Sequence, residues 1–245
     1  MPVLTAASVL VFVLVHLFVG KLRLLEGVPR SRWLSLAGGV AVAYVFLHIL
    51  PELSLHQRGI EERGSTADTS LLETEIYAIA LAGLAVFYGL ERRVRGSRAQ
   101  RQARSGEDRP EAGAFWLHIS SFAVYNVLIG YLLLHGETFG AWPLATYTIA
   151  MALHFLTNDF GLRQDYKSAY DRTARWVIAG AVVAGWLAGL MVEVSETAVA
   201  MLFAFLSGSV ILNVLKEELP EERKSRFLPF AGGVAGYGLL LLLVG

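Results

Sequence analysis

Residues Ala145 to Gly161, ATYTIAMALHFLTNDFG, decide the fold. The stretch is apolar enough to cross a lipid bilayer, yet it carries five polar side chains, those of Thr146, His154, Thr157, Asn158 and Asp159. Ionisable and amide groups at membrane depth are costly unless they face the interior of a helix bundle or a water-filled cavity. We therefore expect a central helix of a membrane bundle, with His154 and Asn158 one turn apart on one face.

A second apolar segment, FWLHISSFAVYNVLIGYLLL from Phe115 to Leu134, carries a similar polar face. His118, Ser121 and Tyr125 stand at positions i, i+3 and i+7, which share one side of a helix. We interpret these two segments as the pair of helices that builds the functional site.

The composition of the 245-residue chain is that of a membrane protein. Hydrophobic residues make up 55% of the chain, charged residues make up 17%, and the mean hydropathy is +0.51, which is too apolar for a soluble domain of this size. The balanced formal charge gives no sign of a nucleic-acid partner. The absence of cysteine excludes disulfides and thiolate metal sites. Because recognisable catalytic motifs are also absent from the sequence, we do not expect an enzyme, and no resident cofactor is expected.

Eight segments meet the requirement of roughly 20 mainly apolar residues for a spanning helix. They cover residues 3–20, 33–51, 73–91, 114–135, 142–162, 174–192, 196–215 and 227–244. Basic residues collect on the cytoplasmic side, and 19 of the 21 Lys and Arg residues follow the first, third, fifth or seventh segment. The sequence therefore predicts a single all-α domain over residues 1–245, a multi-pass integral protein of the plasma (inner) membrane with both termini non-cytoplasmic.

The connection 92–113 is the longest basic stretch. It is short of apolar residues, and we expect a mobile cytoplasmic loop. Two interpretations remain open: a solvated linker, or attraction to anionic lipid headgroups.

Two segments match as inverted copies. GVAVAYVFLHILPE, from Gly39 to Glu52, and GSVILNVLKEELPE, from Gly208 to Glu221, agree at five positions without a gap. The first runs outward and the second inward in the predicted topology, an arrangement from which many secondary transporters are built. The sequence thus predicts two three-helix repeats around the fourth and fifth helices, with chance agreement as the alternative.

These segments resemble the ZIP (Zrt/Irt-like) family of divalent-metal transporters. The resemblance rests on LAGGVAVAYVFLHILPEL from Leu36, AGLAVFYGLERR from Ala82 and SGSVILNVLKEELPEE from Ser207. ALHFLTNDFG, from Ala152, is similar to the family motif His-x-x-Pro-Glu-Gly, with His154 on the histidine and Asn158 on the glutamate. In LHISSFA, from Leu117, His118 falls on the motif histidine, and Phe122 replaces an acidic ligand.

The resemblance implies eight helices, both termini outside, and metal ligands on the fourth and fifth helices. It implies a transporter that moves a divalent metal cation such as zinc, iron or manganese toward the cytoplasm, with the ion as substrate. The candidate residues at the midplane are His118, His154, Asn158, Ser121 and Asp159. His48 and Glu217 stand opposite each other in the inverted match, near the outer and inner mouths, and are either entry and exit ligands or simply solvated side chains. Asp159 lies about 100° around a helix from Asn158, so it joins this site only if the helix is broken there.

Several alternatives remain open. His118 and His154 could equally be hydrogen-bonded packing residues, and His16 is expected to be structural. His56 and His135 are expected outside the membrane without a special role. The loss of two acidic ligands also suits a ZIP-like protein that no longer transports and acts as a sensor or membrane partner, or a carrier of another small solute. Besides the lipid bilayer, a homodimer partner is an alternative to internal packing for two Gly-x-x-x-Gly pairs, Gly185/Gly189 and Gly232/Gly236.

Overall fold

The computed structural model describes residues 2–22, 25, 31–63, 75–106, 112–135, 140–218 and 226–244. The described residues are helical almost throughout, and no strand occurs among them. The α-helices are α1 (Pro2–Phe18), α2 (Arg32–Tyr44), α3 (Leu50–Arg63), α4 (Glu75–Ser105), α5 (Ala112–His135), α6 (Ala141–Tyr166), α7 (Arg175–Met191), α8 (Glu196–Glu218) and α9 (Phe227–Val244). The expected all-α class is confirmed.

Short turns of other helix types continue some of these helices. A 3-10 turn, η1 (Val19–Lys21), follows α1. A π turn, η3 (Val45–Ile49), joins α2 to α3, and a second, η5 (Tyr170–Ala174), leads into α7. The helices therefore run further than the α-helical bounds alone indicate.

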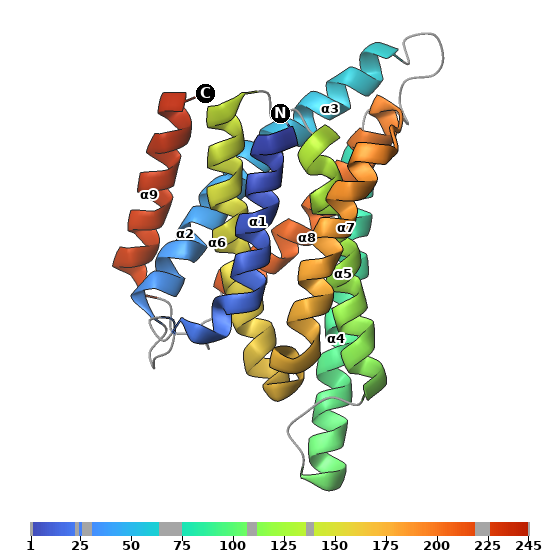
Figure 1. Cartoon of the computed structure of the whole chain (residues 1–245), viewed down its shortest axis with the longest axis vertical. Coiled ribbons are helices and arrows are strands. Elements are labelled where there is room, and N and C mark those ends of the chain that lie inside the picture. The colour runs from blue at the N-terminus through green and yellow to red at the C-terminus, as the bar shows by residue number, and fades with distance from the viewer. Residues whose placement is uncertain are drawn as a thin grey trace.

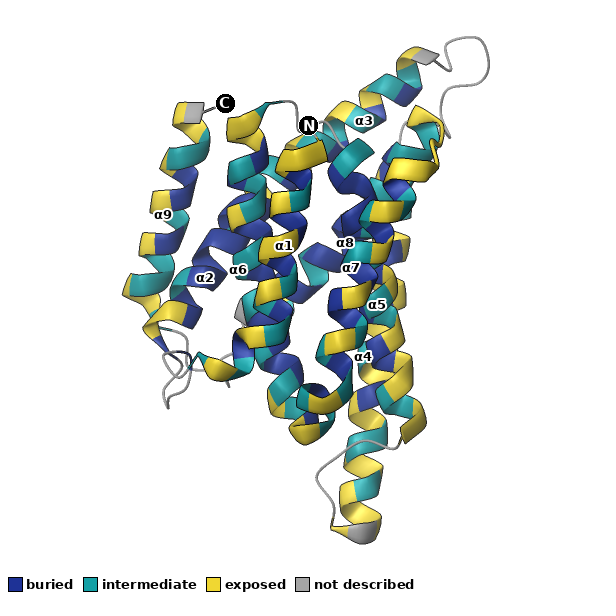
Figure 2. Ribbon diagram, in the orientation of Figure 1, coloured by how far each residue is buried: buried dark blue, intermediate teal, exposed yellow. Residues whose placement is uncertain are grey.

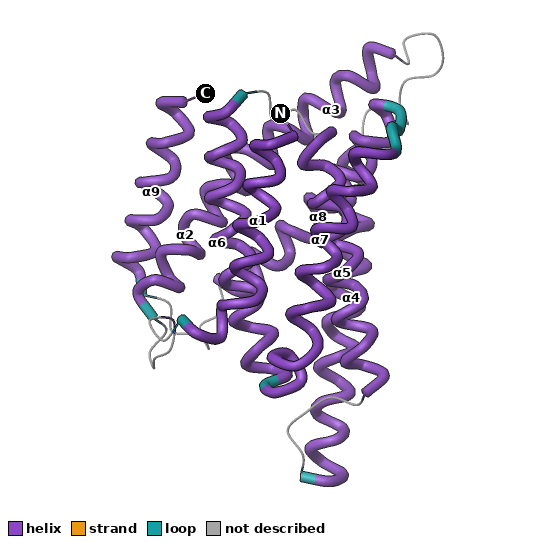
Figure 3. The backbone as a smooth tube through the Cα atoms, viewed as in Figure 1, coloured by secondary structure: helices purple, strands orange, loops and turns teal. Residues whose placement is uncertain are grey.

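Most of the helices run side by side in one bundle (Figure 1). The central α6 lies against α1 and α2, while α5 packs on α7, α4 on α8 and α2 on α9. At one end α3 leaves the bundle obliquely, and at the opposite end α4 extends beyond its neighbours (Figure 3). The segment Ala145 to Gly161 thus lies within a continuous helix in the interior of the bundle, as its polar residues predicted.

Among the described residues, five helical stretches are long and apolar enough to cross a membrane. They are Pro2–Lys21, Arg32–Glu62, Ala112–His135, Tyr170–Met191 and Glu196–Lys216. Large apolar side chains such as Leu10, Val124 and Trp176 are exposed on the outside of the bundle, where yellow segments alternate with buried ones (Figure 2). Lipid chains, unlike water, are a suitable solvent for such a surface. The chain is a multi-pass membrane protein.

Two of the expected helix ends are wrong. The helix expected at 33–51 continues through η3 and α3 to Arg63. Proline has no N–H group and its ring crowds the preceding turn. Here the π turn Val45–Ile49, which ends two residues before Pro51, widens the helix in that preceding turn. The helix therefore passes the proline without ending.

The basic connection 92–113 is not a loop over its first part, because α4 continues to Ser105. Arg95 donates to Glu91 one turn earlier at 3.0 Å, a spacing that stabilises a helix. Arg98 donates to Asp165 of α6 at 2.7 Å and so fastens the extension to the bundle. Residues 107–111 lie outside the described residues.

Reciprocal glycines bring three pairs of helices into close approach. At each position a Cβ atom would collide with a backbone carbonyl oxygen of the facing helix. The pairs are Gly39 and Gly233 between α2 and α9, Gly83 and Gly208 between α4 and α8, and Gly130 and Gly185 between α5 and α7. Gly185 thus serves internal packing, whereas Gly232 and Gly236 border open space, so the homodimer alternative remains a prediction for α9 alone.

Candidate functional site

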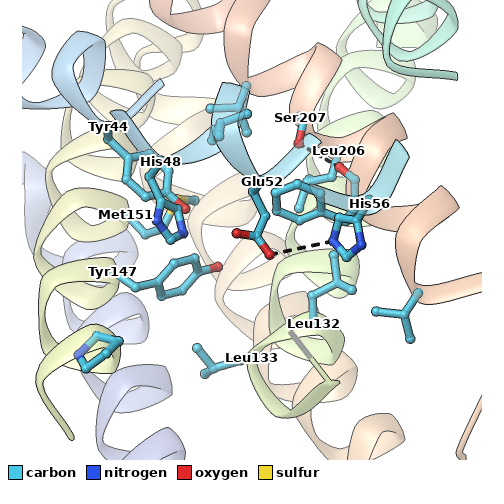
Figure 4. Close-up of a pocket in the computed structure, with 15 residues that line it drawn as sticks. Tyr44, His48, Glu52, His56, Leu132, Leu133, Tyr147, Met151, Leu206 and Ser207 are labelled. Carbon is cyan, nitrogen blue, oxygen red and sulfur yellow. Dashed lines mark hydrogen bonds and ion pairs between the residues drawn. The ribbon is translucent and has the colours of Figure 1, made fainter. Parts of the chain in front are cut away.

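A cavity of about 80 Å³ lies among η3, α3, α5, α6 and α8, near the end of the bundle where α5 ends and α6 begins. This volume holds several water molecules. Its walls are mainly apolar, and its polar side chains include His48, Glu52, His56 and Tyr147. Figure 4 shows Glu52 between the two imidazoles, with Tyr147 directed toward it from α6.

Three of the polar side chains of the cavity come from one helix face. His48, Glu52 and His56 follow one another at intervals of four residues, which places them one above another. The His56 Nε2 atom lies 3.8 Å from the Glu52 carboxylate, and the His48 ring stacks on Tyr44 with centroids 5.0 Å apart. His48 lies within the π turn, a local geometry often found at functional sites. The assignment of His48 to a mouth stays a prediction, and His56, expected to have no special role, lines the same cavity.

His154 lies one turn beyond Met151, a wall residue of the cavity, and is 2% exposed. Its Nε2 atom lies 2.8 Å from the Tyr125 hydroxyl and 3.0 Å from the Asn158 amide nitrogen. Among the described residues, its Nδ1 atom is buried without a hydrogen-bond partner. An amide nitrogen only donates, so Nε2 accepts from Asn158, and the neutral ring carries its proton on Nδ1 as a buried donor that lacks an acceptor in the described part of the chain.

His118 belongs to a different cluster. Its Nε2 atom lies 3.2 Å from the Glu91 carboxylate of α4, and its Nδ1 atom lies 2.6 Å from the Tyr166 hydroxyl. A carboxylate only accepts, so His118 Nε2–H donates to Glu91 and the Tyr166 hydroxyl donates to Nδ1. Both ring nitrogens of His118 are therefore engaged.

The Glu91 carboxylate joins three helices, α4, α5 and α8. Lys216 of α8 lies 3.1 Å from the oxygen that also faces His118, and Arg95 donates to the other oxygen at 3.0 Å. Sequence reasoning missed Glu91 because it is the last residue of the predicted segment 73–91, next to the basic run, where an acid at a helix end needs no special explanation. Its signal is a single acid at the end of AGLAVFYGLERR.

The two clusters do not form the common midplane site that we expected. His154 contacts Tyr125 and therefore lies at the same level along the bundle. Tyr125 is two helical turns from His118 on α5, so the two clusters are separated by roughly 10 Å along the bundle. The Ser121 hydroxyl donates to the backbone carbonyl of His118 at 2.7 Å rather than facing a shared space. The side chain of Glu217 lies outside what the structure describes.

Asp159 faces α1 and pairs with His16. The Oδ2 atom of Asp159 lies 2.6 Å from His16 Nδ1, and His16 Nε2 lies 3.0 Å from the Asn126 amide oxygen. These side chains are at most 2% exposed. Because α6 is unbroken here, Asp159 does not join His154, and the expectation that it would add an oxygen there is wrong. The expectation that His16 is structural stays open. Its partner is Asp159, which the sequence predicts at the midplane site.

Within the described residues, no group of three or more His, Asp or Glu side chains is placed to hold a metal ion together. Pairs do occur, and the pair of Glu52 and His56 borders open space in the cavity. Comparison with protein-family models gave no match, and comparison with curated proteins gave none either.

Proposed function

We propose that this protein is a secondary transporter for a divalent metal cation and that it resembles the ZIP family. The observation that carries the proposal is the cavity of Figure 4, where His48, Glu52 and His56 share one space inside a membrane bundle. Imidazole nitrogen and carboxylate oxygen are the common ligands of zinc and also suit iron and manganese. Ionisable side chains in a membrane bundle mark ion or substrate pathways.

The path continues along α6 to His154. His154 is the next imidazole beyond the cavity wall at Met151. Its Nδ1 atom would bind the ion once the ring proton moves to Nε2 and the Asn158 amide turns its oxygen toward that nitrogen. The cluster of His118 and Glu91 then follows toward the other end of the bundle. In the conformation described, two side chains and water would hold the ion, a weak coordination that suits release to the next site.

The proposed topology has eight spans, adding α4, α6 and α9 to the five apolar stretches. The polar residues of α6 lower its hydropathy but are buried inside the bundle, and α6 lies against the spanning α1. Helices α4 and α9 each pack closely on a spanning partner through glycines. The distribution of Lys and Arg predicts that both termini lie outside. The cavity lies at the same end of the bundle (Figure 1) and would then face outward, and we propose that transport runs from there toward the cytoplasm.

The pattern of glycine contacts supports the proposed inverted repeat. In the sequence match Gly39 of α2 corresponds to Gly208 of α8. Gly39 approaches α9, and Gly208 approaches α4. An inverted repeat relates spans one, two and three to spans six, seven and eight in that order. The contact between spans two and eight, α2 and α9, then corresponds to the contact between spans seven and three, which are α8 and α4.

Titration calorimetry of the purified full chain with Zn²⁺ and Mn²⁺ tests the proposal. We expect binding that weakens by about tenfold or more in His48→Ala and Glu52→Gln, since loss of even an outer partner of a metal costs that much. The matched controls are His135→Ala, whose ring contacts a backbone carbonyl at 2.9 Å, and Glu193→Gln on an exposed connection. Wild-type protein that binds neither ion favours the sensor or the carrier of another solute, and equal binding by all variants moves the site elsewhere.

A further inference from the structure

At the end of the bundle from which α4 projects, a hollow lies between α4 and the start of α5. It is lined on the α4 side by Gly89, Arg92, Arg93 and Gly96, and on the α5 side by Gly113 and Leu117. A Cβ atom added at any of these three glycines would meet nothing within 4 Å. The glycines therefore leave room for another molecule at this surface.

The hollow is electropositive. Arg92 and Arg93 are exposed, and neither forms an ion pair with a described residue. Their neighbours differ, because Arg95 is paired with Glu91 and Arg98 with Asp165. The carboxylate of Glu91 points to Lys216 and His118 on the inner side of α4, so it does not neutralise the two arginines.

The depth of the hollow matches a membrane boundary. On its bundle side, Tyr88 of α4 and Trp116 of α5 are about half exposed, beside exposed Val86 and Leu117. Aromatic rings of this kind gather at the level of lipid headgroups, with apolar side chains toward the acyl region. On the other side the surface continues into the polar extension of α4.

We propose that this hollow, defined by Arg92, Arg93, Gly96 and Leu117, binds the headgroup of an anionic phospholipid. The two guanidinium groups neutralise the phosphate, the glycine surface admits the headgroup, and the acyl chains lie along Leu117 and Tyr88. Basic pockets between membrane helices bind anionic headgroups in this way. The proposal depends on the membrane character of the chain and not on its cargo. In the proposed topology the lipid belongs to the cytoplasmic leaflet.

Titration of the detergent-purified full chain with acyl-labelled phosphatidylglycerol tests the proposal. In Arg92→Gln/Arg93→Gln we expect binding about 30-fold weaker, since each arginine near an anionic headgroup contributes about fivefold. The matched control is Arg101→Gln/Arg104→Gln, which removes the same charge from the same helix beyond the hollow, and there we expect a change of less than about twofold. Equal loss in both double variants, or no loss in either, overturns the proposal.

A second variant tests the shape of the hollow with its charge intact. Gly96→Leu fills open space and replaces glycine within a helix, so we expect a folded protein that no longer binds the labelled lipid. Its control is Gly180→Leu, which also borders open space, on α7. Unlabelled phosphatidylcholine should not compete with the labelled lipid. Full competition by inorganic phosphate would mean a site for free anions and would overturn the lipid assignment. If Gly96→Leu is aggregated, the arginine variants decide.

Discussion

At the level of single residues, the pairing of Asp159 with His16 differs most from what the sequence predicts. An acid beside Asn158 was expected to serve the central site, yet it contacts a histidine 143 positions earlier in the chain. Spacing along one helix defines which side chains share a face, but not which neighbouring helix that face meets. Asp159 therefore contacts α1, whereas Asn158 contacts His154 within α6, although the two residues are adjacent in sequence.

The buried pair predicts an asymmetric mutational response. Removal of one member leaves a buried polar group without compensation, so Asp159→Leu should lower the free energy of unfolding by about 3–5 kcal/mol. The double variant His16→Leu/Asp159→Leu should be less destabilised than the single variant, because neither member is left alone. The control Asp165→Asn breaks a half-exposed pair and should cost at most about 1 kcal/mol.

Detergent-based unfolding of the wild-type chain, the single variants His16→Leu and Asp159→Leu, the double variant and the control measures these differences. A double variant as unstable as the sum of its single variants would contradict the pairing of His16 with Asp159.

Residue types at the candidate site were predictable, but their grouping was not. His118 and His154 are both buried, at 3% and 2% exposure, as their positions within apolar segments indicated. Their separation follows from the relative depth of α5 and α6, which no local pattern encodes. The cavity acid Glu52 and its partner His56 were missed because the helix was expected to end at residue 51.

At the level of elements, apolar length predicted where helices occur but not where they end. Polar sequence beyond a membrane segment can be loop or helix, and the choice depends on local pairs such as Glu91 with Arg95 and on contacts such as Arg98 with Asp165. These pairs extend α4 far past its apolar part. Apolarity alone contains no information about them.

The close helix contacts predict opposite effects for two similar glycine substitutions. Gly208→Ala would place a Cβ atom against the Ala80 carbonyl oxygen, so α4 and α8 must separate, at a cost of about 1–3 kcal/mol. Gly236→Ala borders open space and should stabilise α9 by up to about 1 kcal/mol. Thermal unfolding in detergent compares them, and equal destabilisation of both variants would argue against the close α4–α8 contact.

At the level of the whole molecule, the proposed topology assigns a side to every connection. The chain has no cysteine, so a single introduced cysteine reports its own accessibility. Ser195→Cys, between α7 and α8, should react with an impermeant thiol reagent from outside intact cells. Ser168→Cys, after α6, and Gln102→Cys, on the α4 extension, should react only after permeabilisation. Reaction of Ser168→Cys from outside would remove α6 from the set of spans.

Metal influx into liposomes tests the central claim most directly. Purified protein is reconstituted, Zn²⁺ or Mn²⁺ is added outside, and an indicator inside reports entry of the ion. We predict influx by the wild-type chain and by His135→Ala, and at least a tenfold loss of rate in Glu52→Gln and in His154→Ala. Influx at the wild-type rate in both site variants would contradict a path through the cavity and His154, and a wild-type chain that moves no ion would contradict transport of these cations itself.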